Sequence, residues 1–592
     1  MQIIKRDIVV VGGGGAGLRA AIAANAADPG LTVALISKVV PMRSHTVAAE
    51  GGSAGVIRAD DSIENHFDDT VSGGDWLCDQ EAVQYFVEHC AEEMIQLEHW
   101  GCPWSRLEDG SINARFFGGM KVQRTWFAAD KTGFHLQHTL FQTSLKYPGI
   151  QRYDEFFVAD LIVDDGRVRG VLAIEIATGT LYLFECKAVI LCTGGAARLY
   201  SQNTNAGIVT GEGMGMAYRQ GVPLRDMEFV QYHPTALLGT GILITEGCRG
   251  EGAILTNRHG YRYLQDYGLG PPDPWPRTKA MELGPRDLLS QAFWHEEQKG
   301  NTIDTPRGNA VHLDLRHLGA HKIHERLPLI TEVVKTFVGI DPVTQPIPVR
   351  PAVHHTMGGI TTNRFTETCL PGLYAAGECA SVGIHGANRL GSNSLSELLV
   401  FGRVAGERAA AYARSAGEGH ADAVRRKAEA AAAPLLALLN GAGGAGGERV
   451  ATLRDALGET MEAGIGIFRR AEGMRATCDT LTELRARYRA GIRLGDRSRT
   501  FNTEWLSAIE LGYMLEVAEA LAHSAYQRQE SRGAHVRLDE YATRDDARYL
   551  RHSLASYGGD GPPTITYSPV AITRSPPETR HYGGAGRQAV LT

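Results

Sequence analysis

The sequence has no grouped cysteines. Nine cysteines are spread over 592 residues, and no two of them have C-x-x-C spacing. An iron–sulfur cluster needs several neighbouring thiolates, so this chain is not expected to hold one. The odd number and the scatter also argue against a disulfide framework, and they favour a protein from a reducing compartment.

The sequence also lacks long apolar runs and an excess of basic residues. No stretch reaches the roughly 18 to 20 uninterrupted apolar residues that a membrane-spanning helix needs, and the N-terminus has no secretory pattern. Lys and Arg number 60 against 67 Asp and Glu, a net charge of -7, which argues against nucleic acid as a partner. The length instead predicts a globular protein of about three to five structural units.

Glycine is abundant, with 70 residues, and its first cluster is informative. The β-branched run 8–11 predicts a buried strand, and residues 18–27 predict a helix. Between them, Gly12, Gly14 and Gly17 have G-x-G-x-x-G spacing. In such a turn the first glycine makes the bend, the second lets the backbone approach a pyrophosphate, and the third lets helix and strand pack closely. The segment therefore predicts dinucleotide binding, with the phosphates at the helix N-terminus.

The second predicted strand, residues 31–36, is followed by Ser37 and Lys38. NAD-binding domains place an acidic residue there to hold the ribose hydroxyls, so its absence favours FAD as the cofactor. His45 comes next, among the small residues of RSHTVAAEGG. The local sequence leaves two interpretations of His45 open, an ordinary loop histidine and a functional one.

Six longer segments carry a family resemblance. They read RSHTVAAEGG, HPTALLGTGILITEGCRGEGA, ELGPRD, HHTMGGI, GLYAAGECASVGIHGANRLGSNSL and ESRGAHVRLDE. In these segments the chain resembles the flavoprotein subunits of succinate dehydrogenase and quinol:fumarate reductase, and in particular the bacterial fumarate reductase branch. The resemblance runs from about residue 5 to about residue 585. It implies an α/β fold: a Rossmann-like FAD-binding domain with an inserted α+β capping domain, a helical domain and a C-terminal tail.

The resemblance implies a covalent bond between His45 and the 8α-methyl group of FAD. Such a bond tends to raise the flavin potential, and it prevents loss of the cofactor. The further FAD contacts implied at matching positions are Gly12, Gly14, Gly15, Gly17, Ser37, Lys38, Ser44, Thr46, Gly51, Gly52, Thr193, Gly194, Glu212, Glu378, Ser394 and Leu395. Glu212 stands where the family pattern has aspartate, which keeps the charge but changes its reach.

Fumarate and succinate carry two carboxylates, so their site needs a cationic or hydrogen-bonding group at each end. It also needs a group that moves a proton. The residues that the resemblance places around the substrate are His233, Thr245, His354, Arg389, Phe117 and Gly52. It makes Arg286 the proton donor and acceptor, with Glu246 and Arg249 as the relay to solvent. Arginine is an unusual acid because its ordinary pKa exceeds about 12; a dry, positively charged site with a short relay would permit brief deprotonation.

Three further side chains, those of His354, His355 and Cys248, leave more than one interpretation open. His354 and His355 are adjacent, so on a regular strand they would face opposite sides and only one could point at the substrate. The resemblance selects His354, and His355 stands where the family pattern has an aromatic residue. Cys248 is either a reactive thiol beside Arg249 or a buried, inert one.

A second group of histidines raises the question of a metal. His317, His321 and His324 would share one face of a helix. No signature such as H-E-x-x-H accompanies them, so a solvated face is the better interpretation. No metal site is expected in this chain.

The predicted elements divide the chain into four parts. Residues 1–230 and 354–414 form the FAD-binding domain, where glycine-rich turns alternate with strands. Residues 231–353 form an inserted capping domain, which would close over the flavin and exclude water. Residues 415–535 form a helical domain, and residues 536–592 form a C-terminal domain whose Pro- and Gly-rich end lies on the surface. Further predictions are helices at 395–413, 421–439, 481–494 and 506–529 and a flexible turn at 441–447.

The resemblance predicts the catalytic flavoprotein subunit of a membrane-associated quinol:fumarate reductase. Its electrons would pass to or from an iron–sulfur subunit, with membrane anchor subunits reached through that partner, and a helper protein would assist flavin attachment. The chain would then lie peripherally on the cytoplasmic face of a bacterial plasma membrane.

Three alternatives stay open at this point. The first is a succinate dehydrogenase that works in the oxidative direction; Glu50 favours the reductase, because dehydrogenases of the family have glutamine there. A carboxylate near the flavin should lower its potential by disfavouring the reduced anion. The second is a soluble enzyme like L-aspartate oxidase, which lacks the covalent histidine, so His45 argues against it. The third, a non-catalytic flavin-binding subunit, is disfavoured by Arg286, His354 and Arg389 together.

Overall fold

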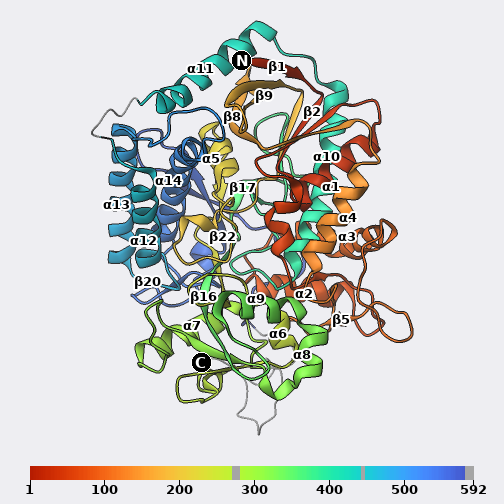
Figure 1. Cartoon of the computed structure of the whole chain (residues 1–592), viewed down its shortest axis with the longest axis vertical. Helices are drawn as coiled ribbons and strands as arrows, with labels where there is room; N and C mark the ends of the chain where they lie inside the picture. The colour runs from red at the N-terminus through yellow and green to blue at the C-terminus, as the bar shows by residue number, and fades with distance from the viewer. Residues whose placement is uncertain (270–280, 442–446, 581–592) are drawn as a thin grey trace.

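The computed structural model describes residues 1–269, 281–441 and 447–580. Figure 1 shows the FAD-binding part in the upper right, helices α12, α13 and α14 on the left, and a smaller unit with α7, α8 and α9 at the bottom. Most of the predicted turn at 441–447 and the end of the predicted C-terminal domain, residues 581–592, lie outside the described residues.

A parallel five-stranded sheet forms the centre of the FAD-binding part. Its order is β18-β11-β2-β3-β7. The strands are β2 (Ile8–Val11), β3 (Val33–Ser37), β7 (Ile150–Asp154), β11 (Ala188–Leu191) and β18 (Leu373–Ala375). Strands β2, β3, β11 and β18 are fully buried, as continuous apolar runs in a parallel sheet predict. The Rossmann-like prediction is confirmed.

The helices α1 (Gly15–Ala27) and α10 (Asn393–Ser415) pack against each other and against this sheet. Helix α1 begins three residues before the predicted start at Leu18, because Gly15 and Gly17 already form its first turn. Further coverage comes from α2 (Ile63–Gly73), α3 (Gln80–His99) and α4 (Thr132–Ser144). Beside them lies a small sheet of β4 (Ser53–Ala54), β5 (Ala114–Arg115) and β6 (Thr125–Trp126).

A second sheet, of order β1-β10-β9-β8, packs near the first at the top of the view (Figure 1). It contains β1 (Gln2–Lys5), β8 (Phe156–Asp164), β9 (Arg167–Glu175) and β10 (Thr180–Glu185). Its apolar side chains join the large core cluster that also includes residues of the helical part. The FAD-binding part and the helices therefore share one buried core.

The inserted segment has its own sheet and its own hydrophobic cluster, drawn from residues 237–349. The sheet is antiparallel, with order β13-β16-β15-β14. Its elements are β13 (Val230–Leu237), α6 (Glu246–Glu251), β14 (Ile254–Thr256), α7 (Arg286–Gln298), β15 (Val311–Asp314), α8 (Ala320–Arg326), α9 (Pro328–Val338) and β16 (Ile347–Thr356). Strand β16 runs past the predicted border at 353/354. The domain borders themselves stay predictions.

The helical part contains α11 (Ala421–Leu439), α12 (Val450–Gly464), α13 (Ala471–Ala490) and α14 (Thr503–Gln527). Helix α14 is buried along most of its length, which fits its almost continuous apolar sequence. The prediction of one helix through residue 494 is wrong: α13 ends at Ala490, because Gly491 adopts φ 137°, outside the helical region.

The C-terminal segment contributes to a further five-stranded sheet, of order β19-β17-β12-β22-β23. Its strands are β12 (Leu224–Arg225), β17 (Gly359–Thr361), β19 (Ala380–Ser381), β22 (Arg551–Ser556) and β23 (Thr564–Pro569). The predicted surface tail from about 560 thus contains an edge strand, β23, paired with β22. This pairing ties the end of the chain to the FAD-binding part.

Candidate active site

A large cavity opens at the carboxyl ends of the parallel strands, where open α/β sheets bind their ligands. Its volume is about 1590 Å³, counting the open mouth. The predicted site residues that line it are Gly12, Gly14, Gly15, Ser37, Lys38, Ser44, His45, Thr46, Gly51, Gly52, Phe117, Thr193, Gly194, Glu212, His233, Thr245, Glu246, Arg286, His354, Glu378, Arg389, Ser394 and Leu395. Of the predicted set, Gly17 and Arg249 lie behind this surface.

The glycine turn between β2 and α1 leaves no room for side chains. A Cβ on Gly12, at φ 113°, would lie 2.1 Å from the carbonyl oxygen of Cys192, and one on Gly17 would lie 1.8 Å from that of Gly12. The Thr46 hydroxyl accepts a hydrogen bond of 3.1 Å from the Gly15 N–H, across the mouth of the turn. Because α1 starts here, the positive end of its dipole faces the cavity, as pyrophosphate binding requires.

An ion cluster closes the far end of the cavity. Lys38 Nζ lies 2.5 Å from Glu212 Oε1 and 2.8 Å from Glu510 Oε1. Burial alone would lower the pKa of Lys38, but the two carboxylates outweigh it and raise that pKa. Glu212 therefore reaches Lys38 despite its extra methylene, while Glu510, on α14, is a partner that the sequence did not suggest.

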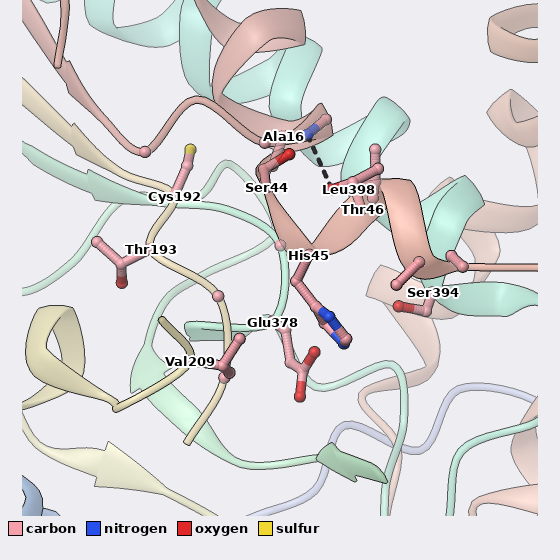
Figure 2. A pocket seen from close by; sticks show the side chains of 18 of the residues that line it. Ala16, Ser44, His45, Thr46, Cys192, Thr193, Val209, Glu378, Ser394 and Leu398 are labelled. Carbon is pink, nitrogen blue, oxygen red and sulfur yellow. Dashed lines mark hydrogen bonds between the residues drawn. The ribbon is translucent and has the colours of Figure 1, made fainter. Parts of the chain in front are cut away.

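His45 and Glu378 reach into the same part of the cavity (Figure 2). His45 Nδ1 accepts from the Ala206 N–H at 3.4 Å, which places the proton of a neutral ring on Nε2. Burial lowers the pKa of His45, and Glu378 opposes that shift. Glu378 Oε1 in turn accepts from the Thr356 N–H at 3.0 Å.

Several buried polar atoms around this region have no protein partner among the described residues. They include the hydroxyls of Ser44 and Thr193 and one oxygen of Glu50. Buried polar groups are normally hydrogen-bonded, so unpaired ones around a large cavity fit a polar ligand. Together with the glycine turn and the helix dipole, they fit FAD, with its pyrophosphate at α1 and its ring system toward His45.

A compact positive cluster lies at the opposite wall, where the inserted segment meets the FAD-binding part. Gln231 Oε1 accepts from Arg286 Nη1 at 3.0 Å and from Arg389 Nη2 at 3.1 Å. Burial and then Arg286 lower the pKa of Arg389 to about 9, a sign of crowded like charges. The His233 and His354 rings lie 5.1 Å apart beside them. Such a cluster suits a dianion.

The carboxylate of Glu246, which also lines the cavity, joins this cluster to Arg249. Arg286 Nε donates to Glu246 Oε2 at 2.8 Å, and Arg249 Nη2 lies 3.7 Å from the same oxygen. Burial raises the pKa of Glu246, but the two arginines outweigh it and lower that pKa. Glu246 stands at the start of α6, where Thr245 caps the helix by accepting from the Gly247 N–H. Arg249 lies fully buried beneath it, and the relay to solvent stays a prediction.

Both His354 and His355 line the cavity. That only His354 points at the substrate stays a prediction. In the pairing of β13 with β16, Gln231 is opposite His355 and Tyr232 is opposite Val353, so His354 has no partner. A β-bulge of this kind breaks the alternation of a regular strand and re-aims a side chain.

The structure also brings in residues that sequence reasoning missed. Gln231 is the central acceptor of the positive cluster, and the hydroxyl oxygen of Thr204 lies 2.7 Å from His354 Nδ1. Gln231 had one detectable signal: it stands two residues before His233, and residues at that spacing share a face where the chain forms a strand. Thr204 had none, because its loop meets β16 only in the fold.

Two open interpretations are settled by burial and backbone geometry. Cys248 is fully buried, and burial raises its pKa well above the ordinary value, so it is an inert thiol. All nine cysteines are free, as predicted. His317 and His321 do not share a helix, because Gly319, at φ 80°, separates a 3₁₀ turn from α8. His321 is exposed, as a solvated face predicts.

Family models match both ends of the chain. The model described as "FAD binding domain" covers residues 7–395, and the one described as "Fumarate reductase flavoprotein C-term" covers residues 454–582. The chain belongs to the fumarate reductase flavoprotein family. It is therefore an FAD-dependent oxidoreductase, and the resemblance seen in the sequence is confirmed.

Relatives of this family match along the whole chain. The fumarate reductase flavoprotein subunit of Proteus vulgaris is 62% identical over 99% of this chain and 98% of its own. A solved quinol fumarate reductase of E. coli superposes with a TM-score of 0.96 at 61% identity, over 99% of this chain and 100% of that one. The succinate dehydrogenase flavoprotein subunit of Rickettsia bellii is 40% identical, over 96% of each chain.

The helices bear on whether this chain could itself cross a membrane. Across the three described stretches, no helix combines the length and the apolar character that crossing a bilayer takes. The longest, α14, carries Glu510, Glu516 and Glu519 within its buried length.

Proposed function

We propose that this protein is the catalytic flavoprotein subunit of a quinol:fumarate reductase, interconverting fumarate and succinate. One observation carries the proposal: Gln231 holds Arg286 and Arg389 side by side at the cavity wall, and Glu246 backs Arg286. A cavity wall with this much buried positive charge suits a dianionic substrate, with Arg389 available to bind a carboxylate and Arg286 to move a proton. Bound FAD would supply hydride transfer to and from the substrate carbon.

In this proposal, the four residues His233, Thr245, His354 and Arg389 bind the carboxylates. Phe117 packs against the substrate. A Cβ on Gly51 would lie 2.7 Å from the Phe117 ring, so this ring borders one of the predicted flavin contacts. Binding at both ends would hold the alkene near the flavin and favour the charge of the transition state.

Arg286 is the proposed proton donor for fumarate and acceptor for succinate. The geometry supports this, because Arg286 and Glu246 both line the cavity and are hydrogen-bonded to each other, so a protonated Glu246 can return the proton. Arg249 lies next to the same carboxylate and completes the relay toward solvent. Each step moves one proton along this row of charge-assisted contacts.

Covalent attachment of FAD at His45 is the second part of the proposal. The ring lines the cavity, and its Nδ1 is already engaged by the Ala206 N–H. Nε2, which carries the proton of the neutral ring, is then the nitrogen left to bond the flavin 8α carbon; as that bond formed, Nε2 and the 8α methyl group would each lose a proton, and the flavin would take up the two electrons. The low pKa that burial gives His45 keeps the ring neutral, the form that acts as a nucleophile.

The proposed partners follow from what the chain does not supply. Its nine cysteines are scattered and free, so electrons would leave the flavin through an iron–sulfur subunit. Membrane anchor subunits would then tie the complex to quinone, on the cytoplasmic face of a bacterial plasma membrane, and a helper protein would assist flavin attachment. A solved relative is described as a quinol–fumarate reductase with menaquinol molecules.

The reductive direction is proposed over the oxidative one. Identity to fumarate reductase subunits reaches 62%, against 40% to a succinate dehydrogenase subunit. Glu50, the residue that distinguishes the two patterns, lines the cavity.

The test joins a cofactor measurement to an activity measurement. The purified protein is denatured in SDS and acid, and the gel is inspected for flavin fluorescence at the chain mass. The native protein is assayed for fumarate-dependent oxidation of a reduced viologen dye. We expect fluorescence in the band and turnover, and His45→Ser should lose the fluorescence while keeping bound flavin. Turnover absent from flavin-loaded protein would refute the fumarate proposal, and free flavin would refute only the covalent bond.

A further inference from the structure

Behind the flavin cavity lies a buried group of two imidazoles and a carboxylate. His385 Nε2 lies 2.8 Å from Glu397 Oε2, and the His355 and His385 rings meet edge-to-face with centroids 5.2 Å apart. All three residues are at most 6% exposed. None of them has a part in the proton relay or in the carboxylate contacts proposed above.

The group touches the flavin cavity through His355. His355 Nδ1 lies 3.3 Å from Glu378 Oε2, while the other oxygen of that carboxylate is held by the Thr356 N–H. Burial raises the pKa of Glu378, so the carboxylate needs donors to stay ionised. His355 is the side chain placed to be the second donor.

The groups around His355 decide whether its ring is charged and which nitrogen carries the proton. Burial and then Arg389 hold the pKa of His355 well below its ordinary value, so the ring is neutral. The charged or titratable groups that face it are Arg389, His385, Glu397, Arg286, Glu378 and His354. A neutral ring has one N–H, and only Nδ1 of His355 is next to a carboxylate. The tautomer with its proton on Nδ1 is therefore the stable one.

Behind this ring, His385 Nε2 donates to Glu397, and neither His385 Nδ1 nor His355 Nε2 has a hydrogen-bond partner among the described residues. Two imidazoles and a carboxylate at this spacing also raise the question of a metal ion. Arg389 and Arg286 argue against it, because two buried positive charges repel a cation.

We infer that His355 is a positioning residue of the flavin site, which holds Glu378 ionised and aimed into the cavity, with the His385–Glu397 pair fixing the ring behind it. The inference rests on the proposed FAD binding. An ionised Glu378 beside the flavin disfavours the added negative charge of the reduced form, so His355 keeps the flavin midpoint potential low.

Three variants of the holoenzyme separate this role from simple packing. His355→Phe keeps the ring volume but removes the N–H, so the pKa of Glu378 should rise further and the midpoint potential should shift upward. His355→Asn retains a donor near the Nδ1 position and should return the parent potential. His385→Phe should shift the potential in the same direction as His355→Phe, because the ring of His355 loses its support.

The measurement is a flavin redox titration from pH 6 to pH 9. The upward shift of His355→Phe should be largest at pH 6 and should shrink as the pH rises, because a higher pH favours the ionised form of Glu378 in every variant. Equal potentials in His355→Phe and the parent at all pH values would overturn the inference. If His355→Phe fails to fold, a His385→Phe potential equal to the parent's would overturn it instead.

Two further readouts make the failures distinguishable. Parent protein that never binds FAD would refute the proposed function itself, whereas flavin-loaded variants without a shift refute only the role of His355. Metal analysis of the purified holoenzyme gives the second readout. About one zinc ion per chain, lost with a potential change on chelation, would replace the positioning role by a metal site; no stoichiometric metal supports the hydrogen-bonded group.

Discussion

Arg286 and Glu246 are joined by a hydrogen bond of 2.8 Å between Nε and Oε2 at the wall of the flavin cavity. The two residues come from different helices of the inserted segment, α7 and α6, and each stands at the first position of its helix. The carboxylate is held in its charged form by the arginines on both sides. A proton that Arg286 takes from succinate can therefore pass to this carboxylate, and in the fumarate direction Glu246 must itself take up a proton before it can return one to Arg286.

Replacing Arg286 by Ala should abolish fumarate turnover while FAD stays bound. We expect kcat to fall by at least about 10³-fold, because general acid catalysis alone contributes about 10²–10⁴. Lysine at this position should rescue little, since it cannot keep the planar contacts to Glu246 and Gln231. Steady-state assays at saturating fumarate measure this, with Arg426→Ala on the exposed face of α11 as the control. Substantial residual turnover would remove the proton-transfer role.

Two variants of Gln231 should separate the effect of guanidinium position from the effect of charge in the same positive cluster. Gln231→Met removes the shared acceptor of Arg286 and Arg389, so both guanidinium groups lose their fixed positions and kcat should fall about 10- to 100-fold. Gln231→Glu keeps the acceptor but adds a negative charge. It should raise KM for fumarate at least about tenfold, the effect of about 1.4 kcal/mol. Unchanged KM in the glutamate variant would contradict a site built on positive charge.

The glycine turn allows a matched pair of backbone variants. Gly12→Ala places a Cβ 2.1 Å from a backbone oxygen, which cannot move without breaking the strand–helix contact. Gly166→Ala has a similar positive φ, 66°, but nothing within 4 Å. We expect Gly166→Ala to lose about 1–2 kcal/mol from left-handed strain alone. Gly12→Ala should lose more and should also lose FAD, as thermal unfolding and flavin absorbance would show; equal unfolding temperatures would contradict this.

The parts that sequence could predict were those set by local chemistry. The β-branched run before Gly12 and the spacing of three glycines predict a strand, a turn and a helix within about twenty residues, so the FAD site could be predicted from the sequence. The ligands of the positive cluster were found because a dicarboxylate demands cations and the family resemblance named them. The helix end at Ala490 was missed because Gly491 was not weighted as a stop signal.

What could not be predicted depended on contacts between distant segments. Glu510 meets Lys38 across 472 residues of sequence, and Thr204 meets His354 across 150. The bulge at His354 was missed for a different reason: strand alternation was applied to both histidines, whereas the pairing with β13 leaves one residue out of register. Such irregularities arise from packing, which local sequence does not encode.

The pH dependence of stability should reveal a buried histidine far from the chemistry. His552 Nδ1 lies 2.6 Å from Asp226, and its Nε2 lies 3.2 Å from Asp79. Burial alone would lower the pKa of His552, but these carboxylates raise it to about 9. Because this exceeds the unfolded value of about 6.5, the stabilisation is complete below pH 6.5 and is lost as the pH rises through 9.

The corresponding variant is His552→Gln. Linkage puts the contribution on the order of 2–3 kcal/mol, so the parent should lose thermal stability between pH 6.5 and pH 9 while the variant starts lower and changes less. Thermal unfolding of the holoenzyme at several pH values measures this. Parallel pH profiles for the two proteins would show that His552 is not charged in the folded state.

Glu50 should affect the flavin potential in a way that depends on pH. Burial, with Asp130 adding to it, raises the pKa of Glu50 well above its ordinary value, and one carboxyl oxygen has no partner among the described residues. The Glu50 carboxyl group is therefore neutral at the acidic end of the pH range of the redox titration, where Glu50→Gln should leave the flavin midpoint potential unchanged. At higher pH the parent gains a charge that disfavours reduced flavin, and the glutamine variant should then have the higher potential. A difference of a few tens of mV is expected, since about 30 mV corresponds to about 1.4 kcal/mol for two electrons. Redox titrations at both ends of the pH range would decide it: a constant difference would mean that Glu50 is charged throughout, and no difference at any pH would remove the argument that this residue favours fumarate reduction.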